Sequence, residues 1–163
     1  MNQLVRELEK KYRESCMTFY RHLHAHPELS YHEEKTAAFV YDILKSLPLD
    51  EIRPNVGGHG VVALLKGDRP GPCVALRADM DALSIQENTG CPFASQIPGV
   101  MHACGHDAHT AILLGTVHVL CEMKKQIAGS LKFIFQPSEE MTPTGGAPGM
   151  IRDGVLENPD VDA

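Results

Sequence analysis

The sequence predicts an α/β fold with a largely parallel or mixed sheet and helices on both faces. Amphipathic helical segments alternate along the chain with short apolar runs typical of buried strands, and clusters of polar residues follow directly after those runs. With 163 residues, 43% of them apolar and 22% charged, the chain has the size and composition of one ordinary globular domain.

Two amphipathic helices are expected before the first strand. Over residues 3–24, apolar side chains recur every four residues among charged ones, and Pro27 closes the segment. Ser30 and Glu33 have the spacing of a capping box for a second helix, whose apolar face ends at Pro48. The histidines at this junction have a spacing that suits no single ligand set and favours a surface or structural role; they are His22, His24, His26 and His32.

Four apolar runs are expected to form strands, at residues 52–56, 61–65, 73–77 and 131–135. Gly57 and Gly58 separate the first two runs and predict a turn. A third helix is expected between the last two runs, opening at a histidine cluster and extending to Met123.

Composition argues against several classes of partner and location. The formal net charge is −6 and the fifteen basic residues are scattered, so a nucleic-acid partner is not expected. No apolar run reaches eighteen residues, so no membrane association is expected either. The first ten residues lack the apolar middle of a signal peptide, and the five cysteines are widely spaced without a CxxC pair. These features predict a cytoplasmic protein with reduced thiols.

The segment 101–110 contains one thiol, three imidazoles and one carboxylate. Cys104 and His106 offer sulfur and nitrogen donors, which suit first-row transition ions better than magnesium or calcium. Four carboxylates follow directly after predicted strands: Asp79, Asp81, Glu139 and Glu140. Because ligands of open α/β sheets bind beyond the carboxyl ends of strands, we expect these groups to converge on one metal site.

The residue types suggest a division of roles at such a site. A metal held by Cys104, His106 and one carboxylate keeps open positions and lowers the pKa of a bound water toward neutrality. Glu139 and Glu140 are adjacent, and neighbouring side chains diverge in an extended segment. One of them can therefore bind metal while the other takes the proton of the attacking water. Asp81 is expected to accept a hydrogen bond from a ligand imidazole and to fix its tautomer.

Four motifs, at residues 24–30, 76–83, 101–110 and 135–140, resemble in order those of a known family of dinuclear metallo-amidohydrolases. This family includes aminoacylases, hippurate hydrolases and indole-acetyl-amino-acid hydrolases. The resemblance implies a dinuclear-metal exopeptidase-like catalytic domain in which Cys104, His106 and Glu140 are metal ligands and Glu139 is the general base. It also implies two divalent ions, of manganese, zinc, nickel or cobalt, and cleavage of an N-acyl amino acid or short peptide. A homo-oligomer of the full-length form is a further implication.

Members of that family are more than twice as long as this chain. The resemblance therefore implies that residues 1–163 are the N-terminal part of a catalytic domain, without the lid and dimerisation domain and without the C-terminal part of the catalytic domain. Two further histidine ligands of the family lie beyond the matched stretch. An inactive fragment that binds at most one metal weakly is accordingly an alternative.

Two other enzyme classes fit part of the pattern. A histidine-aspartate phosphohydrolase would use His106 and Asp107, with His102 and His109 as accessory ligands, but on an all-helical scaffold. A cysteine-nucleophile amidase would use Cys104 with a nearby histidine. Sensitivity of the activity to alkylation, together with indifference to chelators, would favour the second class.

Overall fold

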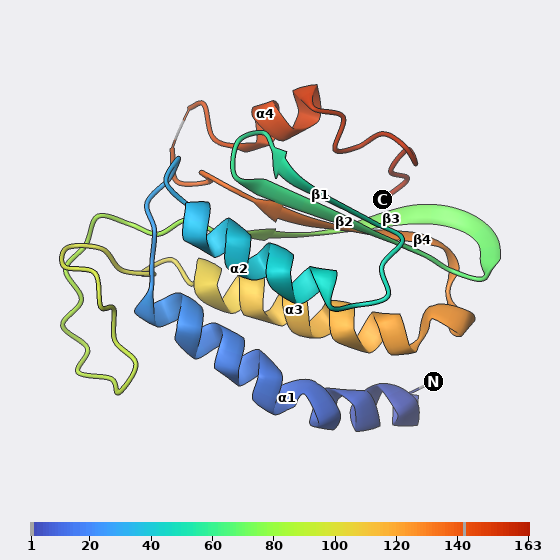
Figure 1. Cartoon of the computed structure of the whole chain (residues 1–163), viewed down its shortest axis with the longest axis horizontal. Coiled ribbons are helices and arrows are strands. Elements are labelled where there is room, and N and C mark those ends of the chain that lie inside the picture. Colours follow the sequence, from blue (N-terminus) through green and yellow to red (C-terminus); the bar gives the residue numbers. More distant parts are fainter. Residues whose placement is uncertain (1, 142) are drawn as a thin grey trace.

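The computed structural model describes residues 2–141 and 143–163, which form a four-stranded mixed sheet covered by helices on both faces (Figure 1). The strand order is β1 (Glu51–Val56), β2 (Gly60–Lys66), β4 (Ala128–Gln136) and β3 (Arg69–Asp79). The β1–β2 and β2–β4 pairs are antiparallel, and the β3–β4 pair is parallel. The predicted α/β class is confirmed in its mixed form, whereas a largely parallel sheet is not formed.

The longer helices lie on one face of the sheet. They are α1 (Asn2–Ala25), α2 (Glu34–Lys45) and α3 (His106–Glu122), while the short α4 (Ala147–Arg152) lies on the opposite face (Figure 1). A 3₁₀ turn, η1 (Lys124–Gln126), follows α3. α2 and α3 pack on the strands, and α1 packs on α3. Within the described residues, none of the helices is both long and apolar enough to cross a membrane.

The core follows from the alternation of side chains along the strands. Phe133 and Phe135 of β4 are fully buried on the face covered by the longer helices, where they join the main apolar cluster. Ile134, between them, faces the other side and packs with Met150 and Val155. Both faces of β4 are therefore buried, which explains why its sequence is an almost continuous apolar run.

The turn predicted at Gly57 and Gly58 connects β1 to β2, as expected. Both glycines have positive φ, at 66° and 105°, a region that residues with a Cβ rarely adopt.

The predicted capping box is wrong. Glu33 occupies the N-cap position of α2 but makes no side-chain cap bond, and Ser30 donates its hydroxyl hydrogen bond to Asp81 Oδ2 at 2.6 Å. The carboxylate of Glu28 replaces the capping box by accepting hydrogen bonds from the backbone N–H and the hydroxyl of Thr36 at 2.7 and 2.9 Å. A tertiary partner has drawn Ser30 away from the role that its local spacing predicts.

The last residues of the chain lie along the free edge of β3. Asp162 N donates to Cys73 O at 2.9 Å, and Ala75 N donates to Ala163 O at 2.8 Å. Because the partner advances from Cys73 to Ala75 as the chain advances from Asp162 to Ala163, this segment runs in the same direction as β3. It points toward Asp79, at the carboxyl end of that strand.

We predict that Phe133→Ala lowers the free energy of unfolding by about 3–5 kcal/mol, because truncation of a fully buried aromatic ring leaves a cavity at the centre of the sheet. Ile112→Ala, at an exposed position of α3, is the control and should have a much smaller effect. Urea denaturation of both variants measures the difference. A similar loss in the two variants would contradict this description of the core.

Candidate metal centre

The site lies where two parallel strands end side by side. In the β3–β4 register, Asp79 is paired with Gln136, so the segments that follow the two strands leave the sheet at the same edge. α3 begins at His106 beside them. The predicted convergence of the strand-end carboxylates with the histidine-rich segment is therefore observed.

Cys104, His106 and Glu140 form a group that could hold a metal ion. One ligand atom of each lies within 4.8 Å of the others, and His106 Nε2 is 3.7 Å from Glu140 Oε1. That Glu140 oxygen is buried and has no hydrogen-bond partner among the described residues. A buried carboxylate oxygen without a partner is costly unless something else neutralises it, and a bound cation would do so. The three residues predicted as ligands thus fit a transition ion in donor type and in spacing.

The ring of His106 is held by the Asp81 segment. Its Nδ1 lies 2.9 Å from the backbone carbonyl of Asp81 and 3.3 Å from Asp81 Oδ1. When the neutral ring donates from Nδ1 to this carbonyl, Nε2 faces the carboxylates and keeps a lone pair that can bind a metal. We predicted the Asp81 carboxylate as the acceptor, but the carbonyl is the closer one.

The Asp81 carboxylate has other partners. Burial would raise its pKa, but interactions with His106, the Ser30 hydroxyl and the backbone N–H of Glu140 outweigh this effect and lower the pKa to about 2. The Glu140 N–H donates to Asp81 Oδ2 at 2.9 Å. Asp81 therefore stays ionised and fixes both the histidine and the glutamate segment.

The site has a negative field. Burial alone would lower the pKa of His106, but Asp81 and Asp79 raise it above its ordinary value overall. The same field acts on Cys104: interaction with Glu140 is the main cause that raises the pKa of its thiol. An environment that retains protons on a histidine and a thiol is one that also attracts a metal cation. A raised pKa also makes Cys104 a poor nucleophile at neutral pH, which disfavours the cysteine-amidase alternative.

Glu139 lies on the same side of the site as Glu140. Its Oε2 is 3.7 Å from His106 Nε2, the distance found for Glu140, and its side chain is 41% exposed. We predicted that the two side chains diverge in an extended segment, and this prediction is wrong. Ser138 has a φ of 56° and turns the chain, so Glu139 and Glu140 lie in a turn that directs both carboxylates to one atom.

A second group of potential ligands shares His106. Asp79 Oδ2 is 3.6 Å from His106 Nε2, and Asp79 Oδ1 is 2.7 Å from His109 Nδ1. Because one imidazole nitrogen binds one ion, this group and the Cys104 group are alternatives for a single ion. Arg77 already donates to Asp79 Oδ2 at 2.8 Å, which favours the Cys104 group. In the sequence analysis His109 has only an accessory role in another enzyme class, although its spacing of three residues from His106 places both on one face of a helix.

His102 is a buried histidine of the same segment. It is 5% exposed, and neither ring nitrogen has a hydrogen-bond partner among the described residues. Burial is the main cause that lowers its pKa to about 4, so the ring is neutral at pH 7. The histidine-aspartate phosphohydrolase alternative needed this residue as a ligand on an all-helical scaffold, and the four-stranded sheet excludes that scaffold.

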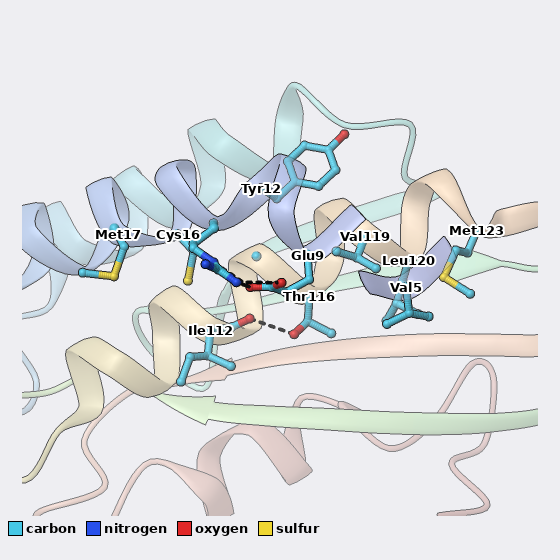
Figure 2. A pocket seen from close by; sticks show the side chains of 12 residues that line it. Val5, Glu9, Tyr12, Cys16, Met17, Ile112, Thr116, Val119, Leu120 and Met123 are labelled. Atoms are coloured by element: carbon cyan, nitrogen blue, oxygen red, sulfur yellow. Dashed lines mark hydrogen bonds and ion pairs between the residues drawn. The ribbon is translucent and has the colours of Figure 1, made fainter. Parts of the chain in front are cut away.

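An apolar groove lies elsewhere in the molecule. A groove of about 450 Å³ between α1 and α3 is lined by side chains such as Val5, Met17 and Ile112, and no member of the metal group lines it (Figure 2). A second hollow of about 420 Å³ reaches the site through Asp79 and His109. The candidate metal group therefore lies at the strand ends, separate from the groove in Figure 2.

Comparison with known proteins places the chain in a family. A family model described as peptidase family M20/M25/M40 matches residues 75–163, more than half of the chain. The chain is 49% identical over 158 residues to an N-acyl-L-amino acid amidohydrolase of Geobacillus stearothermophilus, covering 96% of this chain and 42% of that protein. It is 45% identical over 157 residues to thermostable carboxypeptidase 1 of Saccharolobus solfataricus, covering 96% of this chain and 39% of that protein.

A solved structure with a similar fold and sequence supports the same family. The Bacillus subtilis YXEP protein, described as a dinuclear metal binding peptidase, superposes with a TM-score of 0.84 at 42% identity, over 91% of this chain and 41% of that one. The chain thus spans about two fifths of the length of the relatives that it matches. On this evidence the chain belongs to peptidase family M20/M25/M40.

Proposed function

We propose that this chain is part of a metal-dependent amidohydrolase that cleaves the amide bond of N-acyl amino acids or short peptides. The observation that carries the proposal is the group formed by Cys104, His106 and Glu140, with the Glu139 carboxylate beside it. The substrate class is supported by the names of the similar proteins, an N-acyl-L-amino acid amidohydrolase and a carboxypeptidase.

Cys104, His106 and Glu140 are the proposed metal ligands. A thiolate, an imidazole and a carboxylate together suit manganese, zinc, nickel or cobalt, and a bound ion of this type supplies Lewis acidity and a water of lowered pKa. The two-ion site of the YXEP protein supports two ions in the complete enzyme. Since His106 Nε2 serves only one ion, we infer that the second needs ligands outside residues 1–163.

Glu139 is the proposed general base. Its carboxylate is partly exposed and lies 3.7 Å from His106 Nε2, so it faces the metal group without being enclosed by it. From this position it can accept the proton of an attacking water and return it to the leaving amine. Glu140 is more enclosed, and its buried oxygen has no hydrogen-bond partner in the described part of the chain, which suits a ligand better than a proton carrier.

Residues 1–163 are proposed to be the N-terminal part of the catalytic domain, with a lid and dimerisation domain and a C-terminal part supplied by further sequence, as in a homo-oligomeric full-length form. The relatives support this, because the chain matches only about two fifths of their length. By themselves these residues are proposed to hold at most one ion, weakly. The five free thiols suit the reducing cytoplasm as the proposed location.

The first test compares the 163-residue chain with a chimera that continues after Ala163 with the corresponding remainder of the Geobacillus stearothermophilus relative. We expect the chimera to bind metal tightly and to hydrolyse N-acetyl or N-benzoyl amino acids, because it restores the missing ligands and the substrate-binding parts. The chain alone should show neither property. Metal content and amine release, with manganese, zinc, nickel or cobalt added, are measured for both. Comparable turnover by the 163-residue chain would refute the assignment of an incomplete site.

The two glutamates should give different phenotypes in the chimera. Glu139→Gln should retain metal while turnover falls by ~10²-fold or more, because the general base is lost. Glu140→Gln should lose metal, because a ligand is lost. Metal content after dialysis and turnover are measured on the same samples, with Glu34→Gln on α2 as the control outside the site. Equal loss of metal in the two site variants would show that Glu139 and Glu140 do not have separate roles.

Cys104 should be protected from alkylation by metal in the chimera. A metal-bound thiolate is shielded from iodoacetamide, so modification of Cys104 should slow with zinc present and recover after chelation. Cys16 on α1 belongs to none of the potential ligand groups among the described residues and serves as the internal control, with both rates followed by peptide mass spectrometry. If metal leaves the rate at Cys104 unchanged, this residue is not a ligand.

A further inference from the structure

A buried histidine near the end of α1 lies between two carboxylates. His24 Nδ1 is 2.6 Å from Asp107 Oδ2, and His24 Nε2 is 3.2 Å from Glu87 Oε1. The residue is 7% exposed. A neutral imidazole carries one N–H and can donate to one of these oxygens, whereas an imidazolium donates to both. The geometry therefore fits a positively charged ring held by two anions.

The charge balance around the ring supports the same description. Burial alone would lower the pKa of His24, but the hydrogen bonds to Asp107 and Glu87 outweigh it and raise the pKa. The other titratable groups that face the ring are Tyr20 on α1, Cys91 on the Glu87 loop and the neutral His102.

Each carboxylate is fixed to a different segment near the metal group. Asp107 directly follows His106, and its Oδ1 accepts a hydrogen bond from Ala108 N at 2.8 Å in the first turn of α3. Glu87 belongs to the irregular loop between β3 and α3, and its Oε2 accepts a hydrogen bond from Ser95 N at 2.6 Å. This backbone hydrogen bond is the main cause that lowers the pKa of Glu87 to about 2.

The same loop is attached to α1 by further contacts. Gln96 N donates to Ala25 O at 2.8 Å. The ring of Phe93 lies 5.5 Å from the ring of His24 and 5.6 Å from that of Tyr20. The loop then continues to Cys104, so its attachment to α1 affects the position of that proposed ligand.

We propose that His24 is a positioning residue, whose imidazolium joins the end of α1, the Glu87 loop and the start of α3 and thereby holds Cys104 and His106 in their metal-binding arrangement. This inference rests on the proposed function only in treating Cys104 and His106 as ligands. The joining of the three segments stands on the contacts of His24 alone.

An alternative use of the same residues is a separate metal site. His24, Glu87 and Cys91 each offer a ligand atom, and these atoms lie within 4.8 Å of one another. However, the two ring nitrogens of His24 and both oxygens of Glu87 already have hydrogen-bond partners. This distinguishes them from Glu140, whose buried oxygen has no such partner within residues 2–141 and 143–163. The contacts favour the role of His24 in joining the three segments over a separate metal site.

The test uses the 163-residue chain with His24→Gln, and Glu87→Gln as the milder second variant in case the first does not fold. His22→Gln is the matched control, because His22 lies on the same helix but stacks on Phe39 and is exposed. Cobalt is titrated into each folded variant, and the cobalt–thiolate absorption band reports binding by cysteine. Chymotrypsin cleavage after Phe93 reports attachment of the loop without metal, and the ¹⁵N shifts of the His24 ring report its protonation.

We expect cobalt affinity to fall by about tenfold in His24→Gln and Glu87→Gln, the lower end of the effect of removing groups that orient metal ligands. Cleavage after Phe93 should become faster in both, and His22→Gln should match the unaltered chain. Both ring nitrogens of His24 should be protonated at pH 6. Unchanged cobalt affinity together with unchanged cleavage would overturn the proposal. It would also be overturned if cobalt bound to the His24 ring itself and this ion were lost in His24→Gln.

If the unaltered chain binds no cobalt, the ligands within residues 1–163 are too few to hold an ion by themselves. Cobalt affinity is then compared in the chimera, and cleavage after Phe93 tests the joining of the three segments in the 163-residue chain. Faster cleavage in His24→Gln than in His22→Gln would then still support the joining of the three segments. Equal cleavage would reject it.

Discussion

Asp81 is the residue on which the arrangement of the site depends. Its backbone carbonyl and carboxylate both contact His106 at the start of α3, and its carboxylate accepts hydrogen bonds from Ser30 before α2 and from the backbone of Glu140 after β4. Three segments distant in sequence are thereby fixed to the end of β3. The hydrogen bonds to the carboxylate are made to an ionised, buried group, which makes them stronger than hydrogen bonds between neutral groups. Removal of this carboxylate would deprive both the Ser30 hydroxyl and the Glu140 N–H of their acceptor.

The parallel pairing of β3 and β4 makes these contacts possible. Parallel strands end at the same edge of the sheet, so the segments that follow Asp79 and Gln136 leave the sheet side by side. Glu33 adds a further link, because its buried carboxylate accepts the backbone N–H of Ser138 at 2.6 Å. This bond holds the turn that directs Glu139 and Glu140 to the same histidine nitrogen. The positions of the Glu139 and Glu140 carboxylates are therefore set by hydrogen bonds to the backbone of their segment.

The sequence predicted the strands and the long helices, because apolar periodicity is a local property. Donor types pointed to Cys104 and His106, and the family resemblance to Glu140; the three lie together in the structure, and their role as metal ligands stays a prediction. It did not predict the contacts of Ser30, the turn at Ser138 or the place of His24. Ser30 has the local spacing of a cap, and only the approach of Asp81 in the folded chain changes its partner. His24 was assigned a structural role as one of four histidines, and its two carboxylate partners are more than sixty residues away in the chain. Such pairings are set by tertiary structure and leave no local pattern.

The apolar groove and the candidate metal group lie in different parts of this chain. The groove between α1 and α3 is formed by helix packing, and its side chains contribute no ligand or charge to the site. The polar residues gather at the strand ends, where His106 is shared by two possible ligand groups and can complete only one of them. A site with one shared imidazole and several carboxylates carries more negative charge than a single ion requires.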